Sequence, residues 1–361
     1  MRQFAAVVKR FNRAPFPRRL HNMQQNPTRL PTIVFSSVVR STQQLESHGG
    51  VYLLDLETEQ LTQMIDWDDQ SIDLSQRGGD RGLRGIAFHQ DRMFLAAADE
   101  IFVYDPSFRL RGSLKNPYLR HCHEINTGGG KLFLGSVGYD TILEYDIEAE
   151  RFSAGYCIRY HGIRRKLRRK NREGFQIRPR PTLTVFDPNE EGGPAPADTA
   201  HPSFPWWNDG TLYVAGGGLG HIYAIRDRRM RRFARIPYES HNAHPFRGGL
   251  LMNHSPTHRM MFTDIRGRIR KTWPVPVYDD DRLEFSNVPR DHAYQGFCRG
   301  IAPFGDDIII QGSSPATINL FRWDPPELIK SINVTMDVRN SVHGLELWPF
   351  AEVPSAPPAE A

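Results

Sequence analysis

The residues best suited to chemistry recur at one position of a repeated unit. Their order along the chain is Arg84, His123, Ser203, His241, Arg299 and His343. Five of them lie ten positions before the middle of a short apolar run, such as Met93–Leu95 after Arg84. The sixth belongs to His343-Gly344-Leu345, which repeats the pattern of Arg84-Gly85-Ile86. These six positions, called the ring positions below, are therefore predicted to be equivalent, and in a β-propeller they would surround one end of the central axis.

The three histidines at these positions predict a metal site. His123, His241 and His343 fall on alternate units, so in a sixfold ring they would form a triangle around the axis. Neutral imidazole is a good ligand for zinc or iron(II), and three such ligands leave positions open for water and substrate. We therefore expect a divalent metal, zinc or iron(II), that activates water or polarises a substrate carbonyl.

The other ring positions would bind and convert a substrate at that metal. Arg84 and Arg299 would point into the same space with permanent charge and a planar set of donors, which suits a carboxylate or another oxyanion. Ser203 would take part in proton transfer. The predicted activity is that of a metal-dependent lyase or hydrolase acting on a small anionic organic substrate.

Three further histidines are weaker candidates for metal ligands. His121 and His201 lie two residues before a ring position, so strand alternation predicts that they share its face and support or pair with a ligand. His244 is an alternative to His241 if the turn in that unit is shorter. Trp206 and Trp207 fit either packing within a unit or a wall against the substrate.

A second motif fixes the number of units. A short β-branched and aromatic run that ends in aspartate occurs six times, with the aspartates at Asp55, Asp105, Asp146, Asp227, Asp264 and Asp324. Such a run is typical of a strand that stops at a turn. The shorter intervals, 41 and 37 residues, match a four-stranded blade. The sequence thus predicts an all-β, six-bladed propeller over residues 31–350, with insertions after the second and fifth blades where the intervals are longer.

Both ends of the chain are expected to complete one blade. The first aspartate motif lies near the amino terminus, whereas the last ring strand, Val342–Trp348, lies near the carboxyl terminus. Pairing them would remove two open sheet edges. Residues 1–30, part of a stretch to Arg40 with eight Lys and Arg and no acid, are predicted to form a disordered basic arm or a targeting segment. Residues 351–361, rich in Pro and Ala, are predicted to be a disordered tail.

Composition limits the partners. The net charge of +5 comes mainly from arginine, and we interpret it as a solvated basic face rather than a nucleic-acid surface. No run approaches the roughly 18 apolar residues of a membrane helix. The three cysteines Cys122, Cys157 and Cys298 have no metal-binding spacing, which favours free thiols and a cytoplasmic location. Gly216–Gly220 lies between two predicted strands without a following helix, so it is not expected to bind a dinucleotide.

The insertion near residues 158–198 supplies an alternative function. It contains Arg164-Arg-Lys-Leu-Arg-Arg-Lys170 and Arg172, followed by an acidic run from Asp187 to Asp198. A dense basic run can bind an anionic surface or a protein, although its acidic neighbour can also neutralise it in solution. The second hypothesis is therefore a non-catalytic propeller that binds such a partner through Arg164–Arg172. A third hypothesis is an iron(II) enzyme that activates oxygen.

The ring positions resemble a known arrangement. They are similar to the six-bladed lyase domain of the peptidylglycine alpha-amidating enzymes, in which three histidines hold zinc near arginines and a tyrosine. The resemblance implies that His123, His241 and His343 are zinc ligands and that Arg84 lies near the substrate carboxylate or the attacked centre. The tyrosine has no counterpart, because the third blade offers Ser203. In blade pattern the chain also resembles the TolB-like, NHL and gluconolactonase-like propellers.

Overall fold

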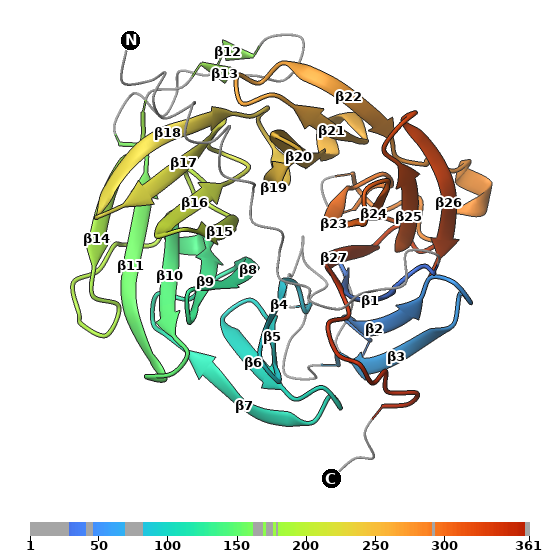
Figure 1. Cartoon of the computed structure of the whole chain (residues 1–361), viewed down its shortest axis with the longest axis horizontal. Helices are drawn as coiled ribbons and strands as arrows, with labels where there is room; N and C mark the ends of the chain where they lie inside the picture. Colours follow the sequence, from blue (N-terminus) through green and yellow to red (C-terminus); the bar gives the residue numbers. More distant parts are fainter. Residues whose placement is uncertain are drawn as a thin grey trace.

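Six antiparallel sheets surround a common axis (Figure 1). The computed structural model describes residues 29–40, 46–68, 82–161, 169–170, 176–177, 180–290 and 293–357. Within these ranges the helical segments are short 3-10 turns such as Val137–Tyr139 and Ser255–Thr257. No helix there has the length and apolar character needed to cross a membrane. The protein is an all-β, six-bladed β-propeller, as the repeats predict.

The blades follow one another along the chain, and each runs from an innermost strand outward. Blade 1 contains β4 (Ile86–His89), β5 (Arg92–Ala96), β6 (Glu100–Tyr104) and β7 (Leu110–Lys115). Blade 2 contains β8 (Cys122–Gly128), β9 (Lys131–Ser136), β10 (Thr141–Asp146), β11 (Arg151–Arg159) and β14 (Thr182–Phe186). Blade 3 contains β15 (Phe204–Asn208), β16 (Thr211–Ala215), β17 (His221–Arg226) and β18 (Arg229–Arg235).

The remaining three blades complete the circle. Blade 4 contains β19 (Ser240–Phe246), β20 (Gly249–His254), β21 (Arg259–Thr263) and β22 (Ile269–Pro274). Blade 5 contains β23 (Arg299–Phe304), β24 (Ile308–Ser313), β25 (Thr317–Arg322) and β26 (Glu327–Asn333). Blade 6 contains β27 (Asn340–Leu347), β1 (Thr32–Val39), β2 (Gly49–Asp55) and β3 (Leu61–Asp66).

Blade 6 closes the propeller with strands from both ends of the chain. Its innermost strand β27 pairs antiparallel with β1, for example through Ile33 opposite Leu347. Figure 1 shows β1 in blue and β27 in red side by side in this blade. The predicted closure is confirmed, and it protects the edges of the first and last strands.

Alternating side chains of each strand bury the space on both sides of a blade. In β5, Met93 and Leu95 pack toward blade 6, whereas Phe94 packs toward blade 2. Six buried apolar clusters result, one between each pair of neighbouring blades. Because a strand buried on both faces needs apolar residues at successive positions, the continuous apolar runs of the sequence are the core strands of the blades.

The aspartates of the second motif end the third strand of each blade. Asp105 Oδ1 accepts the backbone N–H groups of Ser107 and Arg109 at 2.9 and 3.0 Å. Asp264 makes the same pair of bonds to Arg266 and Arg268, both at 2.9 Å. A carboxylate that accepts these bonds replaces the backbone partner lost at a turn, which explains why the motif recurs.

One of the two predicted insertions lies where the sequence placed it, and the other does not. One follows blade 2, as expected, and adds β14 to that blade. The other lies at 275–298, between blades 4 and 5, so the prediction of an insertion after the fifth blade is wrong. The longer interval separates Asp264 from Asp324, and these aspartates follow the third strands of blades 4 and 5. Of the basic insertion, Arg169–Lys170 (β12) pairs with Gln176–Ile177 (β13); residues 162–168, 171–175 and 178–179, like 1–28, lie outside the described residues.

Candidate functional site

The ring positions lie at the start of the innermost strands of the blades. The three histidines belong to β8, β19 and β27, and Arg299 begins β23. Ser203 directly precedes β15, and Arg84 lies two residues before β4. Their backbones approach one another around the axis. Gly85 N–H donates to the carbonyl oxygen of His123 in the next blade at 3.1 Å. A Cβ added to Gly344 would lie 2.2 Å from the Arg84 carbonyl oxygen, so this approach requires glycine.

β-bulges change which side chains reach the axis. The pairing of β8 with β9 shifts between Cys122 and Ile125, so His123 and Glu124 together occupy the place of one residue. The same irregularity occurs where β19 and β23 pair with their neighbours. A bulge redirects side chains that would otherwise alternate between the two faces. The residue after a ring histidine therefore also takes part in the site.

Four imidazoles gather at this end of the axis. The ring centroids of His123 and His343 are 5.6 Å apart, and those of His123 and His201 are 4.9 Å apart. A Cβ at Gly217 would lie 3.6 Å from Cδ2 of His201 and 3.7 Å from Cε1 of His241, so these two rings border the same glycine. The glycine-rich turn between β16 and β17 thus leaves room for two histidines of the site.

Two aspartates position His201. Asp140, which is fully buried, accepts the backbone N–H groups of Thr199, Ala200 and His201 at 2.8, 2.8 and 3.2 Å. Asp198 Oδ1 lies 3.0 Å from Nδ1 of the His201 ring. A carboxylate at Nδ1 favours the tautomer that leaves Nε2 with its lone pair. His201 therefore has the support that is usual for a metal-binding imidazole.

Burial favours the neutral form of the three imidazoles at the ring positions. Burial lowers the pKa of His123, His241 and His343 well below its usual value, because the charged form loses solvation. The guanidinium groups of Arg84 and Arg299 lower it further for His123 and His343. Neutral imidazoles can accept a proton or bind a metal, so both kinds of chemistry are available here.

Glu124 lies between blades 2, 4 and 6 and was not predicted. Its Oε1 is 3.6 Å from Nδ1 of His343, and it forms a side-chain hydrogen bond with Asn242. Burial raises the pKa of Glu124 to about 7, although Arg299, Asn242 and Arg84 oppose that shift. The only sequence signal was a polar residue directly after two of the ring histidines, namely Glu124 after His123 and Asn242 after His241. In a regular strand, alternation would point such a residue away from the axis, so the signal has meaning only once the bulges are known.

Both ring arginines are buried. Arg84 Nη1 donates to the carbonyl oxygen of Cys122 at 2.9 Å. Arg299 Nη1 donates to Ser255 Oγ at 2.9 Å and to the carbonyl oxygen of Cys298 at 3.1 Å, whereas its buried Nε has no hydrogen-bond partner among the described residues. Burial lowers the pKa of Arg299 to about 9. A buried guanidinium with donors to spare is suited to an anion.

The other predicted site residues occupy different surroundings. His121 is exposed and has a left-handed backbone (φ 50°), and its role as a supporting residue stays a prediction. His244 Nδ1 lies 2.8 Å from the carbonyl oxygen of Asn242, with its ring 6.2 Å from that of Phe204. Ser203 is buried, and its carbonyl oxygen accepts the backbone N–H of Glu124 at 3.1 Å.

The imidazoles are of a type that binds metals, but their present orientations do not form a metal site. Imidazoles that share a tetrahedral zinc have ring centroids about 5 Å apart, given bond lengths of about 2.1 Å, and the separations of 4.9 and 5.6 Å are close to this value. Within the described ranges, no three His, Cys, Asp or Glu side chains are placed so that they could hold a metal ion as they stand. A shared metal therefore requires the imidazole nitrogens to turn toward a common point.

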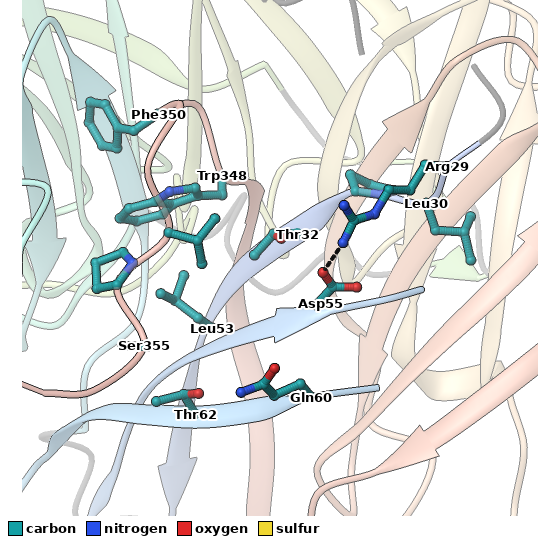
Figure 2. Close-up of a pocket in the computed structure, with 13 residues that line it drawn as sticks. Arg29, Leu30, Thr32, Leu53, Asp55, Gln60, Thr62, Trp348, Phe350 and Ser355 are labelled. Atoms are coloured by element: carbon teal, nitrogen blue, oxygen red, sulfur yellow. Dashed lines mark hydrogen bonds and ion pairs between the residues drawn. The ribbon is translucent and has the colours of Figure 1, made fainter. Parts of the chain in front are cut away.

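A separate pocket of about 470 Å³ lies at the other end of blade 6 (Figure 2). It is bordered by Trp348, Phe350 and Leu53, and by Arg29 and Asp55, whose ion pair measures 2.7 Å. The ring residue of this blade, His343, lies within β27, whereas Trp348 directly follows the last residue of that strand. None of the predicted site residues borders this pocket, and it does not belong to the candidate site.

Comparisons with known proteins add no function. No family model and no curated protein matches the chain. Among solved structures, it is similar to the computationally designed Ika8 protein, with 11% identity, a TM-score of 0.44, and coverage of 86% of this chain and 89% of that one. It is also similar to a protein of unknown function from Bacteroides caccae, with 11% identity, a TM-score of 0.43, and coverage of 88% and 98%.

Proposed function

We propose that the ring of side chains at the axis is the active site of a metal-dependent lyase or hydrolase that acts on a small anionic organic substrate. The observation that supports this most directly is the gathering of imidazoles from blades 2, 3, 4 and 6 beside two buried arginines. Imidazoles supply metal ligands, and arginines supply the complement of a substrate anion. The resemblance to the lyase domain of the peptidylglycine alpha-amidating enzymes is part of this proposal.

The imidazoles are assigned to the metal. His123, His241 and His343 would bind zinc or iron(II), and His201 is an additional ligand of the same kind because Asp198 orients its ring. When bound, the metal would lower the pKa of water and polarise a substrate carbonyl. Neutral imidazoles are ready to bind without first losing a proton.

The remaining residues are assigned to the substrate and to positioning. Arg84 and Arg299 would bind the substrate anion, because their guanidinium groups are buried beside the imidazoles. Glu124 would orient His343, from which it is 3.6 Å away. Ser203, whose side chain is buried at the third ring position, would take part in proton transfer.

Titration with cobalt(II) tests the metal assignment without requiring a known substrate. The visible absorption of bound cobalt reports tetrahedral coordination, and we expect saturation at one equivalent. His123→Ala and His343→Ala should lose this absorption, whereas the exposed His161→Ala should keep it. Wild-type binding by both ring variants, or no binding by the wild type, would overturn the proposal. Oxygen consumption by the iron(II)-loaded protein would separate an oxygen-activating enzyme from a lyase or hydrolase.

The outer strand of blade 3 favours a second function, the binding of an anionic surface. Five exposed arginines on this strand, at the end of β17 and in the turn between the two strands have no ion pair among the described residues: Arg226, Arg228, Arg229, Arg231 and Arg232. Arg180 Nη2 donates to the carbonyl oxygen of Met230 at 2.7 Å, so the end of the basic insertion lies against this strand. Binding to vesicles of anionic phospholipid should weaken steeply as the salt concentration rises, and it should disappear when Arg228, Arg229 and Arg231 are replaced by Gln. Vesicle binding that responds neither to salt nor to these substitutions would exclude this function.

A further inference from the structure

The pocket of blade 6 is built from both ends of the chain. Figure 2 shows Trp348 and Phe350, which follow β27, on one side of the cavity and Arg29 and Asp55 on the other. Leu53 of β2 lies between these two sides. An occupant of this cavity of about 470 Å³ would therefore contact both ends of the sequence, in the blade where β1 and β27 close the propeller.

The lining of the pocket leaves apolar surface uncovered. Val353 is 47% exposed, and Leu30 and Phe350 are half-buried. A concave cavity of this size with apolar lining residues is typical of a binding site. The uncovered apolar surface favours an occupant that brings apolar side chains of its own.

The first described residues of the chain are bound at this pocket. Arg29 Nη2 donates to Asp55 Oδ2 at 2.7 Å, and the backbone N–H of Leu30 donates to Glu57 Oε2 at 3.1 Å. Asp55 and Glu57 belong to the end of β2 and to the turn that follows it. The chain that precedes Arg29 must therefore leave from the rim of the pocket.

Two acidic side chains at this rim form no ion pair among the described residues. They are Glu57, which contacts the lining residue Leu30, and Glu352, which lies between the lining residues Phe350 and Val353. Both are exposed. The rim therefore offers negative charge to a basic partner, in addition to the pair that Asp55 already forms with Arg29.

The segment before Arg29 has a composition that complements this pocket. Residues 1–28 contain six Lys and Arg and no acid, together with apolar residues such as Phe11, Phe16 and Leu20. The nine positions from Leu20 to Arg29 can span up to about 30 Å, so these apolar residues are within reach of the cavity. Because the segment is attached to the rim, its effective concentration there is high, and weak contacts are enough to hold it.

We infer that residues 1–28 dock into the pocket of blade 6 in the same chain. Apolar side chains of the segment contact Phe350 and Val353, and its basic side chains pair with Glu57 and Glu352. The docked segment connects the turn after β2 to the residues that follow β27, and thereby strengthens the closure of the propeller. This inference goes beyond the proposed function, because the pocket lies away from the ring positions.

Photo-crosslinking of the full-length protein tests the inference. Val353→benzoylphenylalanine places a photoreactive ring at the edge of the pocket, and mass spectrometry of tryptic peptides identifies the residues joined to it. We expect crosslinks to residues 11–28, in a product that stays monomeric on a denaturing gel. Val277→benzoylphenylalanine is the matched control, because Val277 is 59% exposed in the connection between blades 4 and 5 and should not crosslink to this segment.

A second pair of variants tests the role of charge. In the Val353→benzoylphenylalanine protein, E57Q combined with E352Q should lower the yield of this crosslink about threefold or more, the effect expected from losing two exposed charge pairs. The side-chain oxygen of Gln can still accept the backbone N–H of Leu30. The control, E148Q combined with E150Q, removes two exposed acids from a turn of blade 2 and should leave the yield unchanged.

The outcomes that would overturn the inference are distinct. Absence of a crosslink from the Val353 variant to residues 1–28, or an equal crosslink from the Val277 variant, would show that the segment does not dock in this pocket. Crosslinks found only in covalent dimers would indicate a second copy of the chain as the occupant. Equal yields from the two pairs of Gln variants would show that the acidic rim does not bind the segment. Thermal melting of each variant checks that the fold is retained.

Discussion

Asp140 should be more important for the site than any carboxylate at a blade turn. Its side chain is fully buried and accepts the backbone N–H groups of Thr199, Ala200 and His201, and also the Thr199 hydroxyl at 2.7 Å. Arg159 Nε lies 3.4 Å from Oδ2. Removing the carboxylate by Asp140→Ala leaves these donors buried without an acceptor and releases the segment that carries His201.

The size of the effect follows from these contacts. Breaking a buried charged interaction by removing one partner costs about 3–5 kcal/mol, and we expect Asp140→Ala to lower the free energy of unfolding by about 4 kcal/mol. Asp140→Asn keeps one acceptor oxygen and tolerates the left-handed backbone at this position (φ 52°), so it should cost about 2 kcal/mol. Because whole domains are stable by only about 5–15 kcal/mol, both losses are measurable.

Urea denaturation followed by circular dichroism measures these free energies. The matched control is Asp146→Ala, because Asp146 accepts one backbone N–H, that of Ala149 at 2.9 Å, in an exposed turn. It should cost about 1 kcal/mol. Histidine NMR spectra of Asp140→Ala should show a shifted signal for His201 and unchanged signals for exposed rings. An Asp140→Ala variant no less stable than Asp146→Ala, or one with an unchanged His201 signal, would refute the reasoning.

Three other predictions concern the fold that supports the site. Gly344→Ala should lower the free energy of unfolding by about 2 kcal/mol or more, because the new Cβ would meet the Arg84 carbonyl oxygen. Gly217→Ala is the control and should leave the free energy of unfolding unchanged, because its Cβ would make only ordinary contacts. Equal denaturation midpoints of the two variants would contradict this. Asp105→Ala should cost about 1–2 kcal/mol at pH 7. The backbone bonds and Arg111 lower the pKa of Asp105, so its stabilisation is present above the unfolded pKa of about 3.9 and is lost as the pH falls through the folded value; a loss that does not shrink in acid would contradict this. The thiols of Cys122, Cys157 and Cys298 should not react with a thiol reagent until the protein unfolds, because all three are buried and burial raises the pKa of Cys122 and Cys298 to about 12; rapid labelling of the native protein would show that they are accessible.

The repeat carried most of the information about the fold. The offset between Arg84 and Met93–Leu95 predicted the innermost and second strands of a blade, and the aspartate motif predicted the turn after the third. Cys122 and Cys298 are buried as strand alternation predicts, each directly before a ring position. These features depend on local periodicity, which a sequence shows directly. The second insertion was assigned to the wrong gap, because the aspartates on either side of it, Asp264 and Asp324, belong to blades 4 and 5.

The site was less accessible to sequence reasoning, because it depends on departures from regular strands. The bulge at His123 and Glu124 brings both to the axis, and alternation had predicted only the first. The left-handed residues His121 and His201 share a position in the repeat, but His121 is exposed, whereas the ring of His201 lies 4.9 Å from that of His123. Its partner Asp140 lies 61 residues away in sequence, so no local pattern could connect them.

The metal content of the purified protein tests the central claim most directly. The account predicts about one equivalent of zinc or iron per chain when the protein is prepared without chelators. His123→Ala should remove it, while the melting temperature stays close to that of the wild type. Less than about a tenth of an equivalent in the wild type, with no rebinding on addition of either metal, would contradict the account, as would a full equivalent retained after loss of His123.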